Sequence, residues 1–288
     1  MVLEHLFPEK WLEKRNYYGF LLGAGYSIIG ILLAGLLFPS DPALVAVAFT
    51  ALLLLPELYK MFSIEERIEE KEKSFSFKEL FKDNKDFIKV YLFVMLGIFV
   101  IYSIAAIVLP SFQVNQLFRE QLEMRGASGG ASGGAYFSSG LFLELLLNNW
   151  WVLFACFIVS LLTGDGAIFL LTWNASMWGT IFGVTARNAA LHSQGNPFVY
   201  LVIVLLIVFP HAFLELLAYT LAAISGGVIS KDVLLEKFES KRFNEVFQYN
   251  FWLFVIAVVV LIIGALVETW VLGNVTIYAD IIQQSFLV

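Results

Sequence analysis

Charged residues and cysteine are scarce in this chain. Asp, Glu, Lys and Arg make up only 15% of the 288 residues, whereas 59% are hydrophobic and the mean hydropathy is +0.80. A soluble domain is about 45 to 50% apolar even when glycine is counted, so this composition excludes that class. It predicts an all-α, polytopic membrane helix bundle. Cys156 is the single cysteine, which excludes an intrachain disulfide and a cysteine-based metal site.

Common catalytic and nucleotide-binding motifs are also missing. The sequence contains no phosphate-binding loop, no HExxH zinc motif and no GxSxG nucleophile motif. We therefore expect no enzyme activity, no metal and no cofactor, and an intramembrane hydrolase is the least favoured function. The expected partners are membrane lipids and membrane or membrane-associated proteins, with a second copy of the chain as a further candidate. Nucleic acid is not an expected partner.

Apolar runs divide the chain into candidate membrane spans. A helix needs about 20 apolar residues to cross a hydrocarbon core of about 30 Å. Seven runs approach or exceed that length: 18–38, 43–59, 88–109, 141–163, 167–184, 198–228 and 250–272. The fourth is convincingly apolar only from Trp150 onward, so the segment 141–184 is either two crossings or a re-entrant hairpin.

The distribution of basic residues predicts the orientation. All 18 Lys and Arg lie outside the apolar cores, and 15 of them fall before the first run, in Lys60 to Lys89, or in Lys231 to Arg242. Under the positive-inside rule this places the N-terminus in the cytoplasm and the C-terminus outside. The predicted parts are an N-terminal hairpin (1–59), a charged and amphipathic cytoplasmic segment (60–87), a membrane domain (88–273) and an external tail (274–288).

Two amphipathic segments and one glycine-rich loop lie between the runs. The segments 74–90 and 231–250 mix phenylalanines with lysines, which is typical of helices at a membrane interface. The external sequence GASGGASGGA (126–135) has no side chains able to form a core, so we expect a mobile spacer.

An imidazole and a carboxylate stand four residues apart in the sixth run. His211 and Glu215 share one face of a helix at this spacing. A carboxylate near the bilayer centre costs about 2.5 to 3.5 kcal/mol, so Glu215 is expected to be paired, protonated or facing water. Pro210 leaves the carbonyl of Leu206 without its helical donor and predicts a kink. His211 falls near the midplane, a depth that Asn174 of the fifth run could share.

Other polar residues mark the ends of the runs. Asn148 and Asn149 are expected to begin a helix or contact the interface, since Asn often caps helices. Gly164, Asp165 and Gly166 interrupt the chain, and Asp165 is expected to cap the next helix. Three glutamates near run ends are expected to reach the interface: Glu57, Glu144 and Glu268.

Pairs of glycines suggest close helix contacts. Gly179 and Gly183 are four residues apart, and Gly226 and Gly227 are adjacent. Small residues let helices approach closely in a membrane, either within one subunit or between two copies.

These features together resemble the stage II sporulation protein M family. The resemblance covers roughly residues 88–273. It rests on the pair Asn148-Asn149, the break Gly164-Asp165-Gly166, Asn174, Pro210-His211 with Glu215, and Gly226-Gly227. Ala212 stands where the family usually has Gly after the His, and Ala175 where Gly follows the Asn. The resemblance implies a membrane scaffold that works with peptidoglycan-degrading partners in spore formers. Most relatives occur where no spore is made, so this role is not carried over.

Two functions remain open from the sequence. The favoured one is a membrane scaffold or accessory subunit of a membrane complex, in which the buried polar residues hold the bundle together through interhelical hydrogen bonds. The alternative is a permease or channel-like component that uses His211, Glu215 and Asn174 along a polar path, with a separate ATPase as partner.

Overall fold

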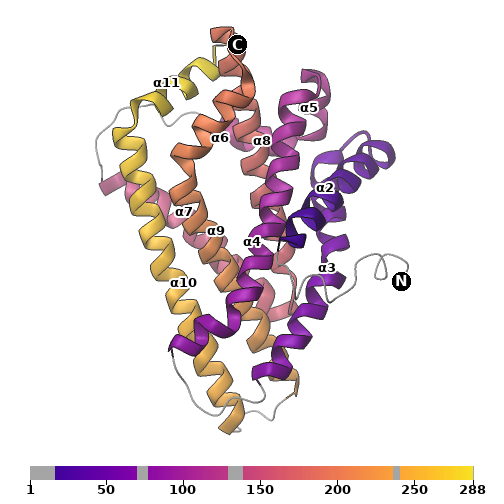
Figure 1. Ribbon diagram of the computed structural model, residues 1–288, viewed down its shortest axis with the longest axis vertical. Helices are drawn as coiled ribbons and strands as arrows, with labels where there is room; N and C mark the ends of the chain where they lie inside the picture. The colour runs from indigo at the N-terminus through magenta and orange to yellow at the C-terminus, as the bar shows by residue number, and fades with distance from the viewer. Residues whose placement is uncertain (1–16, 70–76, 129–138, 236–240, 288) are drawn as a thin grey trace.

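The computed structural model describes residues 17–69, 77–128, 139–235 and 241–287, and side chains within 17–58, 85–124, 140–230 and 243–287. Every regular element in these ranges is an α-helix, as Figure 1 shows. The helices are α2 (Tyr18–Leu37), α3 (Pro42–Glu69), α4 (Phe77–Val108), α5 (Ser111–Leu117), α6 (Arg119–Ser128), α7 (Ser139–Thr163), α8 (Ala167–Ser193), α9 (Pro197–Leu235), α10 (Lys241–Asn274) and α11 (Thr276–Ser285).

Six of the helices are long and apolar enough to cross a membrane. They contain the stretches Tyr18–Leu37, Lys85–Val108, Gly140–Thr163, Ala167–Ser193, Pro197–Ser230 and Phe243–Asn274. The described part of α3 adds a shorter apolar stretch, Pro42–Leu58. The expectation of an all-α membrane bundle is confirmed, while the count of seven crossings and the side of each terminus stay predictions.

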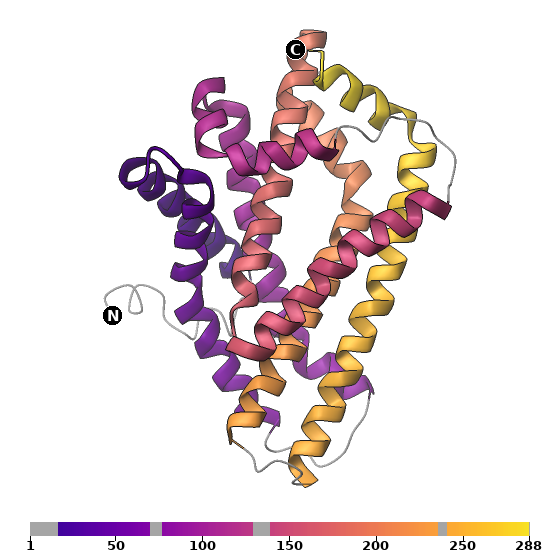
Figure 2. The same cartoon turned by 180° about the vertical axis from the view of Figure 1, so that it is seen from behind.

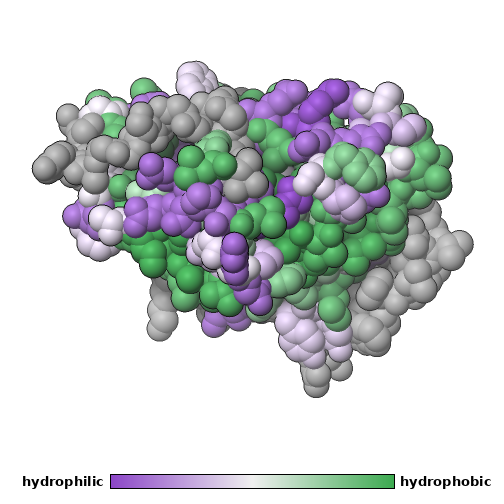
Figure 3. All heavy atoms as spheres, turned by 90° about the horizontal axis from the view of Figure 1, so that it is seen from above, coloured by the Kyte–Doolittle hydropathy of each residue, from purple (hydrophilic) through white to green (hydrophobic). Residues whose placement is uncertain are grey.

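The two ends of the bundle differ in their basic residues and in their short helices. The end of α3, the start of α4, the end of α9 and the start of α10 lie at the lower end in Figure 1. The sequence ranges 60–89 and 231–242, to which these helix ends belong, hold 12 of the 18 Lys and Arg residues. Helices α5, α6 and α11 lie at the upper end. Figure 3 looks down on that upper end and shows hydrophilic residues across it, with hydrophobic residues on the flanks. Large apolar side chains on the flanks are exposed, for example Leu36 (76%), Trp151 (66%) and Leu162 (77%), as expected of a surface in contact with lipid.

Helix packing is organised around α9 and α4. Helix α9 packs against α10 and α7, α4 packs against α8 and α2, and α8 also contacts α9 and so joins the two groups. A single large apolar core runs through both groups and includes the fully buried Tyr102 and Phe118, whose ring centroids are 5.2 Å apart.

Helix α7 crosses the bundle obliquely. In Figure 2 it begins beside the upper part of α10 and descends across α9 to the turn before α8. Its 25 residues extend over about 37 Å at 1.5 Å per residue, which is more than the apolar portion from Trp150 alone provides. Whether the α7 and α8 hairpin crosses the membrane twice or is re-entrant stays a prediction.

The turn between α7 and α8 lies at the interruption seen in the sequence. Gly164 has φ of +82°, a conformation that glycine adopts without steric cost. The hydroxyl of Thr163 accepts a hydrogen bond of 2.8 Å from the Gly166 N–H. Gly166 is the N-cap residue of α8 and no side chain caps it, so the expectation that Asp165 caps this helix is wrong. The Asp165 side chain is buried instead, at 6% exposure.

The two amphipathic segments lead into membrane-spanning helices. Helix α4 begins at Phe77 and α10 at Lys241, so the described parts 77–90 and 241–250 each continue as a helix into the apolar residues that follow. Figure 1 shows the first turns of α4 running across the lower end before the helix rises. The expected tail contains a further helix, α11, which packs on α8 and α9. Most of the glycine-rich loop 126–135 falls outside the described residues.

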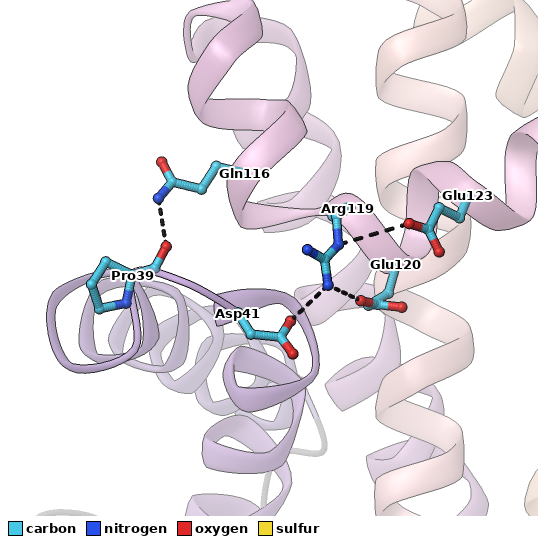
Figure 4. Close-up of polar contacts among 6 residues, drawn as sticks. All are labelled: Pro39, Asp41, Gln116, Arg119, Glu120 and Glu123. Atoms are coloured by element: carbon cyan, nitrogen blue, oxygen red, sulfur yellow. Dashed lines mark hydrogen bonds and ion pairs between the residues drawn. The ribbon is translucent and has the colours of Figure 1, made fainter.

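Helices α5 and α6 connect the hairpin of α2 and α3 to the rest of the bundle (Figure 4). Gln116 of α5 donates its side-chain N–H to the carbonyl of Pro39 at 2.6 Å. The guanidinium of Arg119 lies 3.4 Å from Asp41, 3.0 Å from Glu120 and 3.7 Å from Glu123. These ion pairs are solvent-exposed, so they fix orientation more than they stabilise the fold.

Candidate functional site

Glu215 lies at the centre of a buried polar cluster. It belongs to the middle of α9 and is only 5% exposed. The Nδ2 of Asn149, on α7, donates a hydrogen bond of 2.9 Å to the Oε1 of Glu215. Because the two residues are 66 positions apart in the chain, this bond ties two helices together in the bundle interior.

Glu268 joins the cluster from α10. At Gly264 a Cβ would lie 3.3 Å from the Leu214 Cβ and 3.5 Å from the Glu215 Cγ, so the two helix backbones approach closely there. Glu268 follows Gly264 by four residues and therefore faces the same side. Its carboxyl group makes hydrogen-bond contact with that of Glu215.

The sequence interpretation of Glu268 as an interface group is therefore wrong. The Oε2 atom of Glu268 is fully buried without a hydrogen-bond partner within the described residues. The same interpretation is wrong for Glu57, which is buried at 4% exposure, whereas Glu144 is exposed. A glycine four residues before an acid in an apolar run, as in Gly264 to Glu268, is the signal that could have indicated this close contact.

His211 is buried on the same side of α9 but does not pair with Glu215. It is 6% exposed, and its Nδ1 has no hydrogen-bond partner in the described part of the structure. The amide that bonds Glu215 comes from Asn149 instead. The spacing of His211 and Glu215 therefore placed both residues on one side of the helix without identifying the neighbour that each one meets.

Asn174 and Asn148 form hydrogen bonds within their own helices. The Nδ2 of Asn174 donates to the carbonyl of Leu170, one turn earlier in α8, at 2.8 Å. Asn148 is exposed and donates to the Oδ1 of Asn149 at 3.4 Å. Because α7 begins at Ser139, Asn148 and Asn149 lie well inside the helix, and the expectation that they begin it is wrong.

Pro210 lies within α9 and on its outer side. The helix continues from Pro197 to Leu235 through this proline, and Pro210 itself is exposed. Figures 1 and 2 show that α9 changes direction along its length, and an internal proline is an ordinary cause of such a bend.

The glycine pairs serve contacts within this chain. A Cβ at Gly179 would lie 2.6 Å from the carbonyl oxygen of Phe99, and one at Gly183 would lie 2.7 Å from that of Ser103, so α8 packs closely on α4. Gly226 packs in the same way on the backbone of α7, and Gly227 is buried. These surfaces are thus occupied inside one subunit.

No lysine or arginine among the described side chains acts on either acid of the carboxyl pair. The groups that act on Glu215 are Glu268 and Asn149. Tyr219 of α9 and Tyr278 of α11 lie near enough to interact electrostatically with Glu268. In the described ranges no group of three or more His, Cys, Asp or Glu is arranged to hold a metal ion. The arrangement can join helices and can hold a proton between two acids.

The fold and this intramembrane cluster define a polytopic integral membrane protein. A family model described as Stage II sporulation protein M matches residues 90–271, which is more than half of the chain. The protein therefore belongs to the stage II sporulation protein M family. Neither the curated proteins nor the solved structures gave a match.

Proposed function

We propose that this protein is an integral scaffold or accessory subunit of a complex in the cell membrane. The observation that carries the proposal is the hydrogen bond from Asn149 to Glu215, because it uses the polar groups of the cluster to connect α7 to α9. Glu268 extends the connection to α10. Interhelical bonds of this kind contribute about 0.6 to 2 kcal/mol each, which is sufficient to bias how helices pack.

The position of α7 supports the same proposal. This oblique helix has an exposed outer side that includes Leu143, Leu147 and Trp151. Its inner side is held by Asn149 and by the close contact of Gly226 with the α7 backbone. A helix anchored in this way presents a fixed apolar surface to lipid and to other membrane proteins.

Co-purification from the native membrane tests the scaffold. The full-length protein is extracted in a mild detergent, and its neighbours are identified for the wild type, Asn149→Leu and the matched control Asn148→Leu. We expect defined membrane or membrane-associated partners with the wild type and the control, and fewer with Asn149→Leu. Recovery of the same few chains at background level with all three proteins would contradict the proposal.

The alternative is a permease or channel-like transport component, with a separate ATPase as a candidate partner. Two of the buried polar atoms that have no hydrogen-bond partner among the described residues belong to this cluster, the Nδ1 of His211 and the Oε2 of Glu268. Each such atom requires an explanation, and a functional role is one. Flux of protons or ions in proteoliposomes that Glu215→Gln abolishes, with the fold intact, would replace the scaffold by this alternative.

A further inference from the structure

The contact between Glu215 and Glu268 has a chemical requirement. An ionised carboxylate accepts hydrogen bonds and has no proton to donate. Two carboxyl groups in hydrogen-bond contact therefore need one proton between them. The Asn149 amide donates to the Oε1 of Glu215, so it supplies one bond to the pair but not the bond that joins the two acids.

Ionisation of both acids is strongly opposed at this position. Like charges a few ångströms apart do not both persist in a medium of low dielectric constant. Among the described residues, the titratable and polar groups on the elements packed against the pair include Asn149 of α7, His211 and Tyr219 of α9, and Tyr278 of α11, with Cys156 of α7 beside Tyr219. None of them is a lysine or arginine that would neutralise a second negative charge.

Close packing keeps the two acids together. The absence of a side chain at Gly264 lets α10 approach Glu215, and Glu268 is fixed one turn away on the same side of α10. This packing holds the backbones that carry the two acids close to each other.

We propose that Glu215 and Glu268 form a binding site for one shared proton, and that this proton holds α9 to α10. The inference concerns what the pair binds, so it goes beyond the scaffold role and is compatible with either proposed function. It adds a ligand, the proton, to the contact between these two acids.

The proposal predicts the sign and size of a pH effect. Glutamates in the unfolded chain ionise above about pH 4.3, whereas the folded pair keeps one proton. The folded state then binds one proton more than the unfolded state, so stability falls as the pH rises. The folding equilibrium constant should decrease about tenfold per pH unit, from above pH 4.3 until the folded pair itself loses the proton.

Reversible unfolding of the full-length protein in detergent measures this effect. The wild type is compared with Glu215→Gln/Glu268→Gln, whose amides keep the size of the side chains and supply N–H donors without titrating. The exposed Glu144→Gln is the matched control. We expect the ratio of the wild-type constant to that of the double variant to fall about tenfold per pH unit. Glu144→Gln should follow the wild type.

Each other result overturns the proposal. Parallel profiles for the wild type and the double variant would mean that the pair holds no proton. A hundredfold change per pH unit would mean that each acid keeps its own proton. Recovery of stability at alkaline pH on adding sodium chloride, but not choline chloride, would identify a cation site.

Infrared spectroscopy provides a second measurement if the double variant does not fold. The wild type should show a deuterium-sensitive carbonyl stretch of a protonated carboxylic acid at neutral pH, and Glu268→Gln should change it while Glu144→Gln does not. A wild-type spectrum without that band, or a band unaffected by Glu268→Gln, would also overturn the shared proton.

Discussion

Substitution of Gly183 by alanine tests the packing of α8 on α4. An added Cβ would lie 2.7 Å from the carbonyl oxygen of Ser103 and 2.8 Å from the Cβ of Ala106. Both distances are shorter than van der Waals contact, and the nearest obstacle is backbone. The two helices must therefore move apart to accept a single methyl group.

The size of the effect follows from two opposing contributions. Overpacking of a tight contact costs about 1 to 3 kcal/mol. Alanine is better than glycine in a helix interior by about 0.8 to 1.0 kcal/mol, which partly offsets the loss. Gly25→Ala in α2 isolates the second contribution, because a Cβ there would meet nothing within 4 Å. We expect Gly183→Ala to be about 1 to 3 kcal/mol less stable than Gly25→Ala.

Equilibrium unfolding of both variants in the same detergent gives this difference directly. The comparison is between two glycine-to-alanine changes in helices, so differences in composition and in the unfolded chain cancel. Equal stability of the two variants would refute the close approach of α8 to α4. A Gly183→Ala protein more stable than the wild type would refute it as well.

Two further predictions concern polar side chains. Asn149→Ala should lower the free energy of unfolding by about 1 to 2 kcal/mol because the buried Glu215 loses a donor, whereas the exposed Asn148→Ala should change it by less than about 0.5 kcal/mol; denaturant titration of both variants measures this. Burial, and then the nearby Glu268, raise the pKa of Tyr278. Its contribution to stability should be intact below about pH 10 and decline as the pH rises further. Alkaline unfolding should therefore be less steep for Tyr278→Phe, and an unchanged profile would contradict the partly buried position of this side chain.

The sequence predicts the helices well because each helix is determined by residues within its own segment. Each apolar run is long enough to require a helix in lipid, and Gly164 to Gly166 interrupt the chain where no run continues. The ends are less predictable, since backbone hydrogen bonding continues past the apolar residues. Helix α8, for example, extends through Arg187, which donates to the carbonyl of Leu109 at 3.2 Å.

The partners in the polar cluster are not predictable in the same way. Helical spacing places His211 and Glu215 on one side of α9, but the residue that meets each of them depends on how α7 and α10 cross α9. Asn149 reaches Glu215 only because α7 runs obliquely, and Glu268 reaches it only because Gly264 permits a close approach. Neither crossing is encoded in the periodicity of a single segment.

The group of α2, α4 and α8 and the group of α7, α9 and α10 are held together by different interactions. The two groups should therefore respond differently to changes in side-chain size and in pH. Lipid chains are as apolar as the helices, so association in the membrane depends on close packing and on polar contacts. Helices α2, α4 and α8 meet through glycines, including Gly179 and Gly183, and should respond to the size of side chains. Helices α7, α9 and α10 meet through Asn149, Glu215 and Glu268 as well, and under the proposed proton site they should also respond to pH. A rise in pH should therefore loosen α10 from α9 before it disturbs the contact of α8 with α4, and hydrogen exchange resolved by segment can follow the order of these events.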